Sequence, residues 1–421
     1  NGKVPESYVH IGTPMMAKVK YTDNALEHRG LAIFTVLWRV ESSAWYAKLK
    51  LWQEKWIHPE VHGARGGHET LHSAWPAQAR IEESILRGQD RCAATLDYSK
   101  FFDMFDSDFY MDMLTDMGYP KALAEVQRDM YTRLIRHIKV AGSFGDELAP
   151  TCGMGQGCSL TLIAANATVT IEFLMLDKIT PTVYKGAFID DRSLDCHKVE
   201  ELKQGIEAIV EMDTIMGHTT NIDKSKCLAT AKKVRKTMKS IQMNGISINL
   251  VNNFKLLGHR CIAGGKYIRT DQNEQAQEAI LRTRRIATLP VGHMGKIKLL
   301  KASPMKVITA TNQWAEANPK LIKVLISEIN RVVWGEKRKM RAIEIVYGVL
   351  YDGTAMEPSL ATYWQVFVNA RRMLTKSTDM LYTAKRVIRM RSRQAQEEQV
   401  IEAPGPIEWL MKAATQVGLT V

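Results

Sequence analysis

The chain has 421 residues, with 57 Lys and Arg against 45 Asp and Glu, so its formal net charge is +12. Hydrophobic residues make up 45% of it, enough for the cores of about two to three domains, which excludes long-range disorder. The six cysteines contain no Cys-x-x-Cys pair, which argues against a disulfide scaffold and an obvious zinc site. The positive excess indicates a phosphate-rich partner, although solubility alone would also explain it.

No segment is expected to cross a membrane. The longest apolar stretch, 158–176, is interrupted by Asn166, Glu172 and several threonines. No N-terminal signal peptide is expected, and the cysteine usage indicates a reducing compartment. We therefore expect an intracellular protein without a membrane partner.

The expected elements change in character twice along the chain. Residues 1–90 mix short apolar runs with basic residues, 91–265 alternate strands and helices, and the remainder is mostly helical and basic. Within the middle region, strands are expected at 93–98, 138–141, 147–149, 183–189 and 193–196, and helices at 120–137, 159–178 and 199–216. The basic residues after 280 cluster at 282–285, 296–301, 337–341 and 385–393.

The most informative local feature is a pair of adjacent acids, Asp190 and Asp191, between two apolar strand-like runs. Carboxylates so close repel one another, and an exposed turn would hold them harmlessly. Asp97 has the same setting at the end of the strand expected over 93–98, which favours one shared site. Carboxylates at neighbouring strand ends can hold two divalent ions about 3.5–4 Å apart, and hard oxygen ligands suit Mg²⁺.

Around these acids the sequence resembles the reverse transcriptases of the non-LTR (LINE-type) retrotransposon and group II intron kind. Five palm motifs and two upstream fingers segments occur in the family's order. They are Leu96–Asp103, Gly153–Leu160, Phe188–Asp191, Asn221–Lys226 and Phe254–Gly258, preceded by Arg29–Ile33 and Gly63–Thr70. Each motif alone is weak, but seven in the right order are a specific signal.

The resemblance implies an α+β fold of the right-hand polymerase type, with an antiparallel palm sheet and a mostly helical C-terminal part. Part of the fingers is expected at 1–90, the palm with the reverse-transcriptase motifs at 91–265, a helical basic thumb at 266–345 and a helical basic extension at 346–421. It also implies an RNA-directed DNA polymerase that transfers a nucleotide from a dNTP to a primer 3′-hydroxyl. The implied partners are an RNA template, a DNA primer and dNTP, and the implied cofactor is a pair of Mg²⁺ ions, with Mn²⁺ as a substitute.

By the same resemblance, Asp97, Asp190 and Asp191 are the catalytic acids and the metal ligands. Phe102 would lie under the nucleotide sugar, where a rigid ring leaves no room for a 2′-hydroxyl; a core phenylalanine is the alternative. The other implied nucleotide contacts are Lys20, Arg29, Gln156, Gly157 and Lys224. The implied template and primer contacts are Arg65, Phe254, Leu257 and Gly258.

The residue types at these positions suit such contacts. Lys20 and Arg29 supply positive charge for a triphosphate, with Lys18 as an alternative register for Lys20. Gly157 lacks a Cβ and so permits a close approach of the backbone to the nascent base pair. Lys224 would neutralise the departing pyrophosphate, although a solvated surface lysine fits the sequence nearly as well.

Other interpretations stay open from the sequence alone. Gly30, Ala64 and His68 depart from the residues usual in the family, which would fit a catalytically decayed nucleic-acid-binding protein. A viral-type RNA-dependent RNA polymerase has the same arrangement of acids, but Phe102 stands where such enzymes carry an Asp. An unrelated basic scaffold would leave the motif order as coincidence. A chromosomal retroelement would place the protein in the nucleus, and the oligomeric state is left open.

Overall fold

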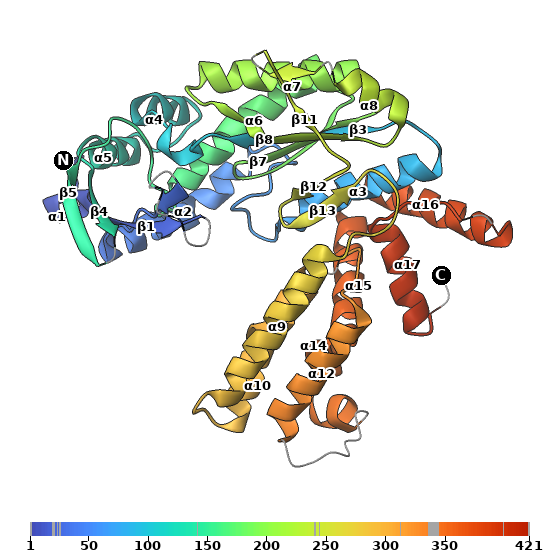
Figure 1. Cartoon of the computed structure of the whole chain (residues 1–421). Coiled ribbons are helices and arrows are strands. Elements are labelled where there is room, and N and C mark those ends of the chain that lie inside the picture. Colours follow the sequence, from blue (N-terminus) through green and yellow to red (C-terminus); the bar gives the residue numbers. More distant parts are fainter. Residues whose placement is uncertain are drawn as a thin grey trace. The chain divides into compact units, whose positions relative to one another are not determined.

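The computed structural model combines helices and strands throughout the part of the chain that it describes (Figure 1). The described residues are 2–18, 22, 24, 27–140, 142–239, 241–243, 245–311, 313–335, 345–398 and 400–419. Two features of the sequence analysis, Lys20 and the basic cluster at 337–341, therefore lie outside the described residues.

The chain divides into two compact units. Unit 1 comprises Asn1–Thr70, Ala93–Cys227 and Lys239–Asn249, and unit 2 comprises Leu71–Cys92, Leu228–Met238 and Leu250–Val421. Each unit has its own apolar core, built around residues such as Phe105 and Met130 in unit 1 and Leu300 and Leu325 in unit 2. The predicted boundaries of fingers, palm, thumb and extension stay predictions.

The centre of unit 1 is a five-stranded sheet in the order β11-β8-β3-β7-β6. Its strands are β3 (Cys92–Tyr98), β6 (Tyr184–Phe188), β7 (Asp191–Cys196), β8 (Thr220–Ala229) and β11 (Asn249–Leu250). Strands β6 and β7 form an antiparallel hairpin in which Phe188 pairs with Asp191. Helix α7 (Val199–Ile215) packs on β7 and on α6 (Thr161–Ile179), which is apolar on nearly every side and buried along most of its length.

A second sheet in unit 1 has the order β2-β1-β4-β5. Its strands are β1 (His10–Ala17), β2 (His28–Gly30), β4 (Ile135–Val140) and β5 (Ser143–Leu148). The helix expected over 120–137 is wrong at its end, because α5 (Lys121–Thr132) stops earlier and Ile135 begins β4. Residues 135–139 pair with β1, and this long-range pairing overrides the local helical pattern.

The remaining described elements are mostly helices in unit 2, as expected for the C-terminal part of the chain. In unit 1 they are α1 (Glu6–Val9), α2 (Val36–Gln53), η2 (Phe101–Asp103), α4 (Ser107–Asp116), β9 (Gln242–Met243) and β10 (Ile246–Ser247). In unit 2 they are α3 (Leu71–Leu86), α8 (Lys232–Met238), β12 (Asn253–Leu256), β13 (His259–Ile262), α9 (Thr270–Thr288), α10 (His293–Ala302), α11 (Pro304–Thr311), α12 (Pro319–Trp334), η3 (Val346–Leu350), α14 (Gly353–Met356), α15 (Pro358–Lys376), α16 (Thr378–Gln396) and α17 (Pro406–Gln416). The predicted α+β class with a mostly helical C-terminal part is confirmed.

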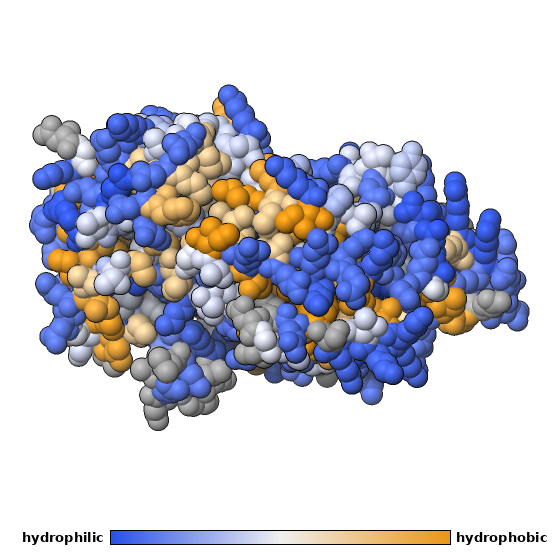
Figure 2. Space-filling view, turned by 90° about the horizontal axis from the view of Figure 1, so that it is seen from above, coloured by the Kyte–Doolittle hydropathy of each residue, from blue (hydrophilic) through white to orange (hydrophobic). Residues whose placement is uncertain are grey.

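The described helices and the surface fit the composition of the chain. Among the described residues, no helix combines the length and the apolar character needed to cross a bilayer. The face drawn in Figure 2 is mainly hydrophilic, with apolar patches between the polar side chains. None of the six cysteines forms a disulfide.

Candidate active site

Three acids from two neighbouring strands meet at the β6–β7 hairpin. Asp97 lies in β3, next to the end of that strand, while Asp190 occupies the turn and Asp191 begins β7. Strands β3 and β7 are adjacent in the sheet. Besides burial, the negative charge of Asp97 contributes to raising the pKa of both Asp190 and Asp191, so the three acids lie close enough to repel one another.

The turn that carries Asp190 has a strained backbone. Ile189 has a φ of 59°, a left-handed conformation that is a genuine outlier for a β-branched residue. Two backbone hydrogen bonds fix the strand segment before this turn. The His62 N–H donates to the Ala187 carbonyl (2.8 Å), and the Ala187 N–H donates to the Glu60 carbonyl (2.9 Å). A Cβ on Gly63 would lie 2.4 Å from the Ile189 nitrogen, so this approach requires glycine.

Burial and mutual repulsion shape the electrostatics of the acids. Burial raises the pKa of Asp190, and burial together with the charges of Asp190 and Asp97 raises the pKa of Asp191 to about 6. Two predicted cations act in the opposite sense: Arg29 lowers the pKa of Asp190, and Lys224 lowers that of Asp191. Burial and mutual repulsion therefore outweigh the nearby cations at Asp190 and Asp191, and the pKa of each stays raised.

One atom of the site lacks a hydrogen bond. The buried Oδ2 of Asp97 accepts none, although the Lys224 Nζ lies 3.2 Å away as an ion-pair partner. A carboxylate oxygen whose one partner is the exposed Lys224 ammonium could also serve as a ligand of a divalent cation, which prefers such oxygens. The arrangement is looser than a formed metal site, since the carboxylate oxygens of the three acids do not all lie within 4.8 Å of one another.

A buried network of charges lies behind the catalytic acids, and we call it the palm charge network. The fully buried Arg192 donates to Asp213 through two nitrogens (2.8 and 3.0 Å) and to Glu172 (3.0 Å). Its guanidinium stacks 3.6 Å from the centre of the Tyr98 ring, and the Tyr98 hydroxyl donates to Glu172 (2.5 Å). Burial raises the pKa of Glu172 to about 8, because a buried carboxylate is costly to ionise.

Strand alternation connects this network to the catalytic acids. Tyr98 directly follows Asp97, and Arg192 directly follows Asp191, so each catalytic strand turns one acid to the site and the next side chain into the network. The palm motifs do not reveal the role of these supporting residues. The signal was present, because Glu172 is an acid in the middle of an otherwise apolar helix, which requires a buried partner.

The two adjacent phenylalanines of the first palm motif have different surroundings. Phe101 is buried and stacks on Tyr98 with ring centres 4.2 Å apart. Phe102 is only partly buried, and its ring lies parallel to that of Phe105 at 6.1 Å. Phe101 is a core residue, and Phe102 packs against the edge of the same core. The contact of Phe102 with the sugar stays a prediction.

The glycine-rich second motif packs closely on the fingers segment. A Cβ on Gly157 would lie 2.3 Å from the Ala32 carbonyl oxygen, and one on Gly155 would lie 2.4 Å from the Phe34 ring. This intramolecular packing is a reason for glycine that the sequence did not supply. Gln156 between them is exposed, as a residue that contacts a nucleotide must be.

Arg65 is already engaged within the chain. Its Nε and Nη2 donate to the two carboxylate oxygens of Glu54 (3.0 and 2.6 Å), and its Nη1 donates to the Val61 carbonyl (2.8 Å). These bonds hold the loop that precedes the 63–70 segment. The predicted contact of Arg65 with a template phosphate stays a prediction, and it would require these bonds to rearrange.

The predicted primer-gripping segment in unit 2 is a tight hairpin. Strands β12 and β13 pair from Asn253 to Ile262, and Leu257 and Gly258 form the two-residue turn between them. Both turn residues have positive φ, 53° and 85°, as a type I′ turn requires. Phe254 lies in β12 and is buried.

Comparison with known proteins agrees with the motifs. The family described as reverse transcriptase (RNA-dependent DNA polymerase) matches residues 22–261, which is more than half of the chain. The chain belongs to this reverse transcriptase family. The right-hand polymerase fold that we predicted is the fold of this family, and RNA-directed DNA polymerase is the activity that the family's description names.

Solved structures of telomerases resemble the chain only distantly. A truncated apo telomerase from Candida tropicalis is 10% identical, with a TM-score of 0.40 over 62% of this chain and 55% of that one. A Candida albicans telomerase in complex with a fragment of telomeric RNA is also 10% identical, with a TM-score of 0.45 over 92% of this chain and 63% of the other. The chain thus spans less than two thirds of these proteins. No curated protein matches it significantly.

Proposed function

We propose that this chain is the polymerase part of a retroelement reverse transcriptase of the non-LTR or group II intron kind. It would extend a DNA primer with dNTPs on an RNA template, inside the cell and, for a chromosomal element, in the nucleus. The observation that carries the proposal is the group of Asp97, Asp190 and Asp191 at neighbouring strand ends, whose negative charges repel one another. The ordered motifs around them support the same function.

Asp97, Asp190 and Asp191 would hold two Mg²⁺ ions. When bound, such ions lower the pKa of an attacking hydroxyl and neutralise charge on the leaving phosphate. The chain's own residues supply the rest: Arg29 and Lys224 bring positive charge to the edge of the acidic site, and the rigid turn at Ile189 fixes the position of Asp190. A primer 3′-hydroxyl, a dNTP and a template base would align between them.

Primer extension with an Asp190→Asn variant tests the proposal. The assay extends a DNA primer on homopolymer RNA with Mg²⁺, and we expect a loss of at least about 10²–10³-fold, the scale of losing one preorganised charge. RNA binding should change little. Asp116→Asn, an exposed aspartate at the end of α4, is the matched control and should retain full extension. Extension by the Asp190 variant at the rate of the wild type would refute the assignment.

The same assay separates the alternatives. A wild-type chain that binds RNA but never extends the primer would support a decayed polymerase. A preference for ribonucleotides would support the RNA-dependent RNA polymerase. Phe102→Val should admit ribonucleotides by removing a clash worth about 1–3 kcal/mol, a factor of roughly 5–150, whereas Phe109→Val on the exposed face of α4 should not.

A further inference from the structure

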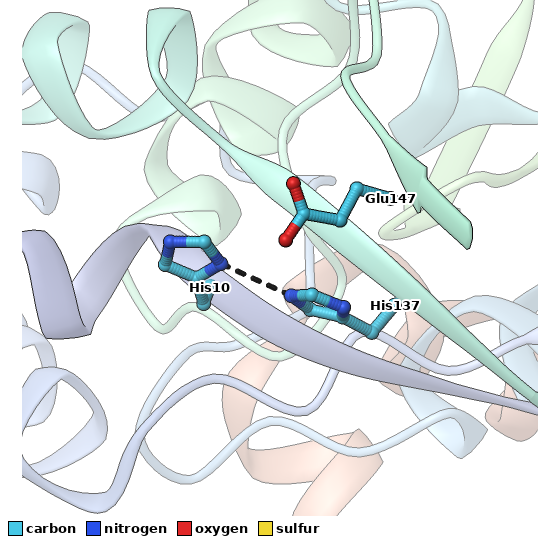
Figure 3. A group of neighbouring side chains, drawn as sticks. All are labelled: His10, His137 and Glu147. Atoms are coloured by element: carbon cyan, nitrogen blue, oxygen red, sulfur yellow. Dashed lines mark hydrogen bonds between the residues drawn. The ribbon is translucent and has the colours of Figure 1, made fainter. Parts of the chain in front are cut away.

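A second group of candidate ligands lies away from the acids, on the β2-β1-β4-β5 sheet. His10 comes from β1, His137 from β4 and Glu147 from β5, three neighbouring strands of that sheet. Their ligand atoms all lie within 4.8 Å of one another, and within the described ranges this is the one such group of His, Cys, Asp and Glu side chains. Figure 3 shows the two rings facing each other, with the Glu147 carboxylate turned toward them.

The strand register brings the three side chains to one face. His137 pairs with Glu147 across the antiparallel β4–β5 ladder and with Gly12 across the parallel β1–β4 ladder. His10 is two residues before Gly12 and therefore shares its face. Gly12 leaves the space beside His137 open, since a Cβ there would meet nothing within 4 Å. The His10 and His137 rings, which lie diagonally across the β1–β4 ladder, occupy this open space.

The distances suit nitrogen ligands to one ion. His10 Nδ1 lies 3.0 Å from His137 Nε2, and the rings stack with centres 5.3 Å apart. Two nitrogens bound tetrahedrally to one Zn²⁺ stand about 3.3–3.4 Å apart, so a shift of a few tenths of an ångström would admit the ion. On the other side of His10, its Nε2 lies 3.5 Å from Glu6, which favours a proton on Nε2 and a lone pair on Nδ1.

We propose that His10, His137 and Glu147 form a binding site for a zinc-class divalent ion. Two imidazoles and one carboxylate are a ligand set of Zn²⁺, with water in the fourth position, whereas Mg²⁺ prefers oxygen ligands alone. The site is therefore chemically distinct from the three aspartates and would fill in the presence of excess Mg²⁺.

The ion would stabilise an edge of the sheet that lacks a core. Every residue of β5 is exposed, and no residue of β4 is fully buried. Strand β4 also carries Arg136, which alternates to the other face and donates to Asp103 of the first palm motif (3.1 Å). Fixing β4 through His137 would thus steady a residue that supports the segment around Phe102.

Metal titration of the full chain in excess Mg²⁺ tests the proposal. Co²⁺ serves as the spectroscopic probe and Zn²⁺ as the competitor. We expect one Co²⁺ per chain with the visible absorption of a four-coordinate ion, displaced by Zn²⁺, and affinity at least tenfold weaker in His137→Asn and Glu147→Gln. The matched controls are His28→Asn on β2 of the same sheet and Asp146→Asn, the neighbour of Glu147 on β5; both should bind as the wild type does.

Two measurements keep the outcome unambiguous. Circular dichroism of each variant establishes that loss of Co²⁺ binding is not loss of the fold, and His10→Asn is the second ligand variant if His137→Asn fails to fold. Asp190→Asn should retain the Co²⁺ spectrum, since the aspartates belong to the other site. A spectrum that persists in the histidine variants, or an absorption typical of six oxygen ligands, would overturn the proposal.

Discussion

Each of the two units buries charged side chains, and the two networks that result are built differently. In unit 1 the palm charge network surrounds a buried cation, Arg192, with Glu172 and Asp213. In unit 2 a buried acid, Glu82, accepts from Arg391 (3.0 and 3.1 Å) and from two backbone N–H groups that begin α17 (2.8 and 3.0 Å). We call Glu82, Glu83 and their arginines, Arg386 and Arg391, the α3 charge network.

The difference lies in how far along the chain each network reaches and in what remains if its arginine is lost. Arg192 and Glu172 are 20 residues apart, whereas Arg391 and Glu82 are 309 apart. The palm network fixes a local hairpin beneath the catalytic acids. The α3 network ties the C-terminal helices of the chain to α3, and the amide groups of α17 still solvate Glu82 when the arginine is absent.

The largest effect should follow from Arg192→Met. It leaves Glu172 and Asp213 buried without their cation, a change that typically costs about 3–5 kcal/mol. Hydrogen exchange should become faster in peptides of β3, β6 and β7, and primer extension should fall because the turn that carries Asp190 loses its support. Arg192→Lys keeps the charge but not the two-nitrogen contact, so its losses of stability and of primer extension should lie between those of the wild type and Arg192→Met. A loss below about 1 kcal/mol would mean that the network is not a structural support.

Arg391→Met should cost less, about 2–4 kcal/mol, because Glu82 retains its two backbone donors. The faster hydrogen exchange should be confined to α3, α16 and α17. Arg389→Met, an exposed position on the same helix, is the matched control and should change stability by no more than about 0.5 kcal/mol. Equal losses in the two arginine-to-methionine variants would erase the distinction between the networks.

The sequence predicted the palm better than unit 2 for a physical reason. The palm motifs are short, and their strands, turn and acids are specified by residues close together in the chain, so β3, α6, β6, β7 and α7 were found within a few residues. The basic cluster at 385–393 is part of the positive excess that indicates a phosphate-rich partner, but two of its arginines, Arg386 and Arg391, pair with acids of α3. Contacts between residues so far apart in the chain produce no periodic pattern in the sequence. The same holds for the contact between His10 and His137.

The sequence predicted the catalytic residues of the candidate site but not the residues that support them. Asp97, Asp190 and Asp191 could be located because acids after apolar strands are conspicuous. Arg192 was passed over, although an arginine directly after two acids on a buried strand must find counter-charges. The requirement for glycine at Gly155 and Gly157 comes from the close approach of Ala32 and Phe34, which only the folded chain shows.

The pH dependence of stability should differ between the networks. Burial raises the pKa of Glu82 from 4.5 to about 7 and that of Glu172 to about 8. In both cases the folded chain holds a proton that the unfolded chain has released, so stability falls as pH rises from about 4.5 to the folded pKa. Between pH 5.5 and 8.5, the free energy of unfolding should fall by about 2 kcal/mol less in Glu82→Gln than in the wild type, and this difference should be complete near pH 7. Denaturant unfolding at each pH measures it. The Glu172→Gln difference should extend to about pH 8; identical slopes in wild type and both variants would contradict the raised pKa values.

The smallest predicted difference concerns one threonine that is hydrogen-bonded to a member of each network. Thr220 donates its hydroxyl to Asp213, whereas Thr383 accepts from Arg386 (3.1 Å), which keeps Glu83 as its main partner. Valine is nearly isosteric with threonine, so each substitution removes one hydrogen bond. Because a charged carboxylate loses a donor in Thr220→Val, that variant should cost about 1.5–3 kcal/mol, against about 0.5–1.5 kcal/mol for Thr383→Val. Parallel denaturant unfolding of the two variants measures the difference. A larger loss for Thr383→Val would mean that the α3 network, rather than the palm network, depends on every hydrogen bond it contains.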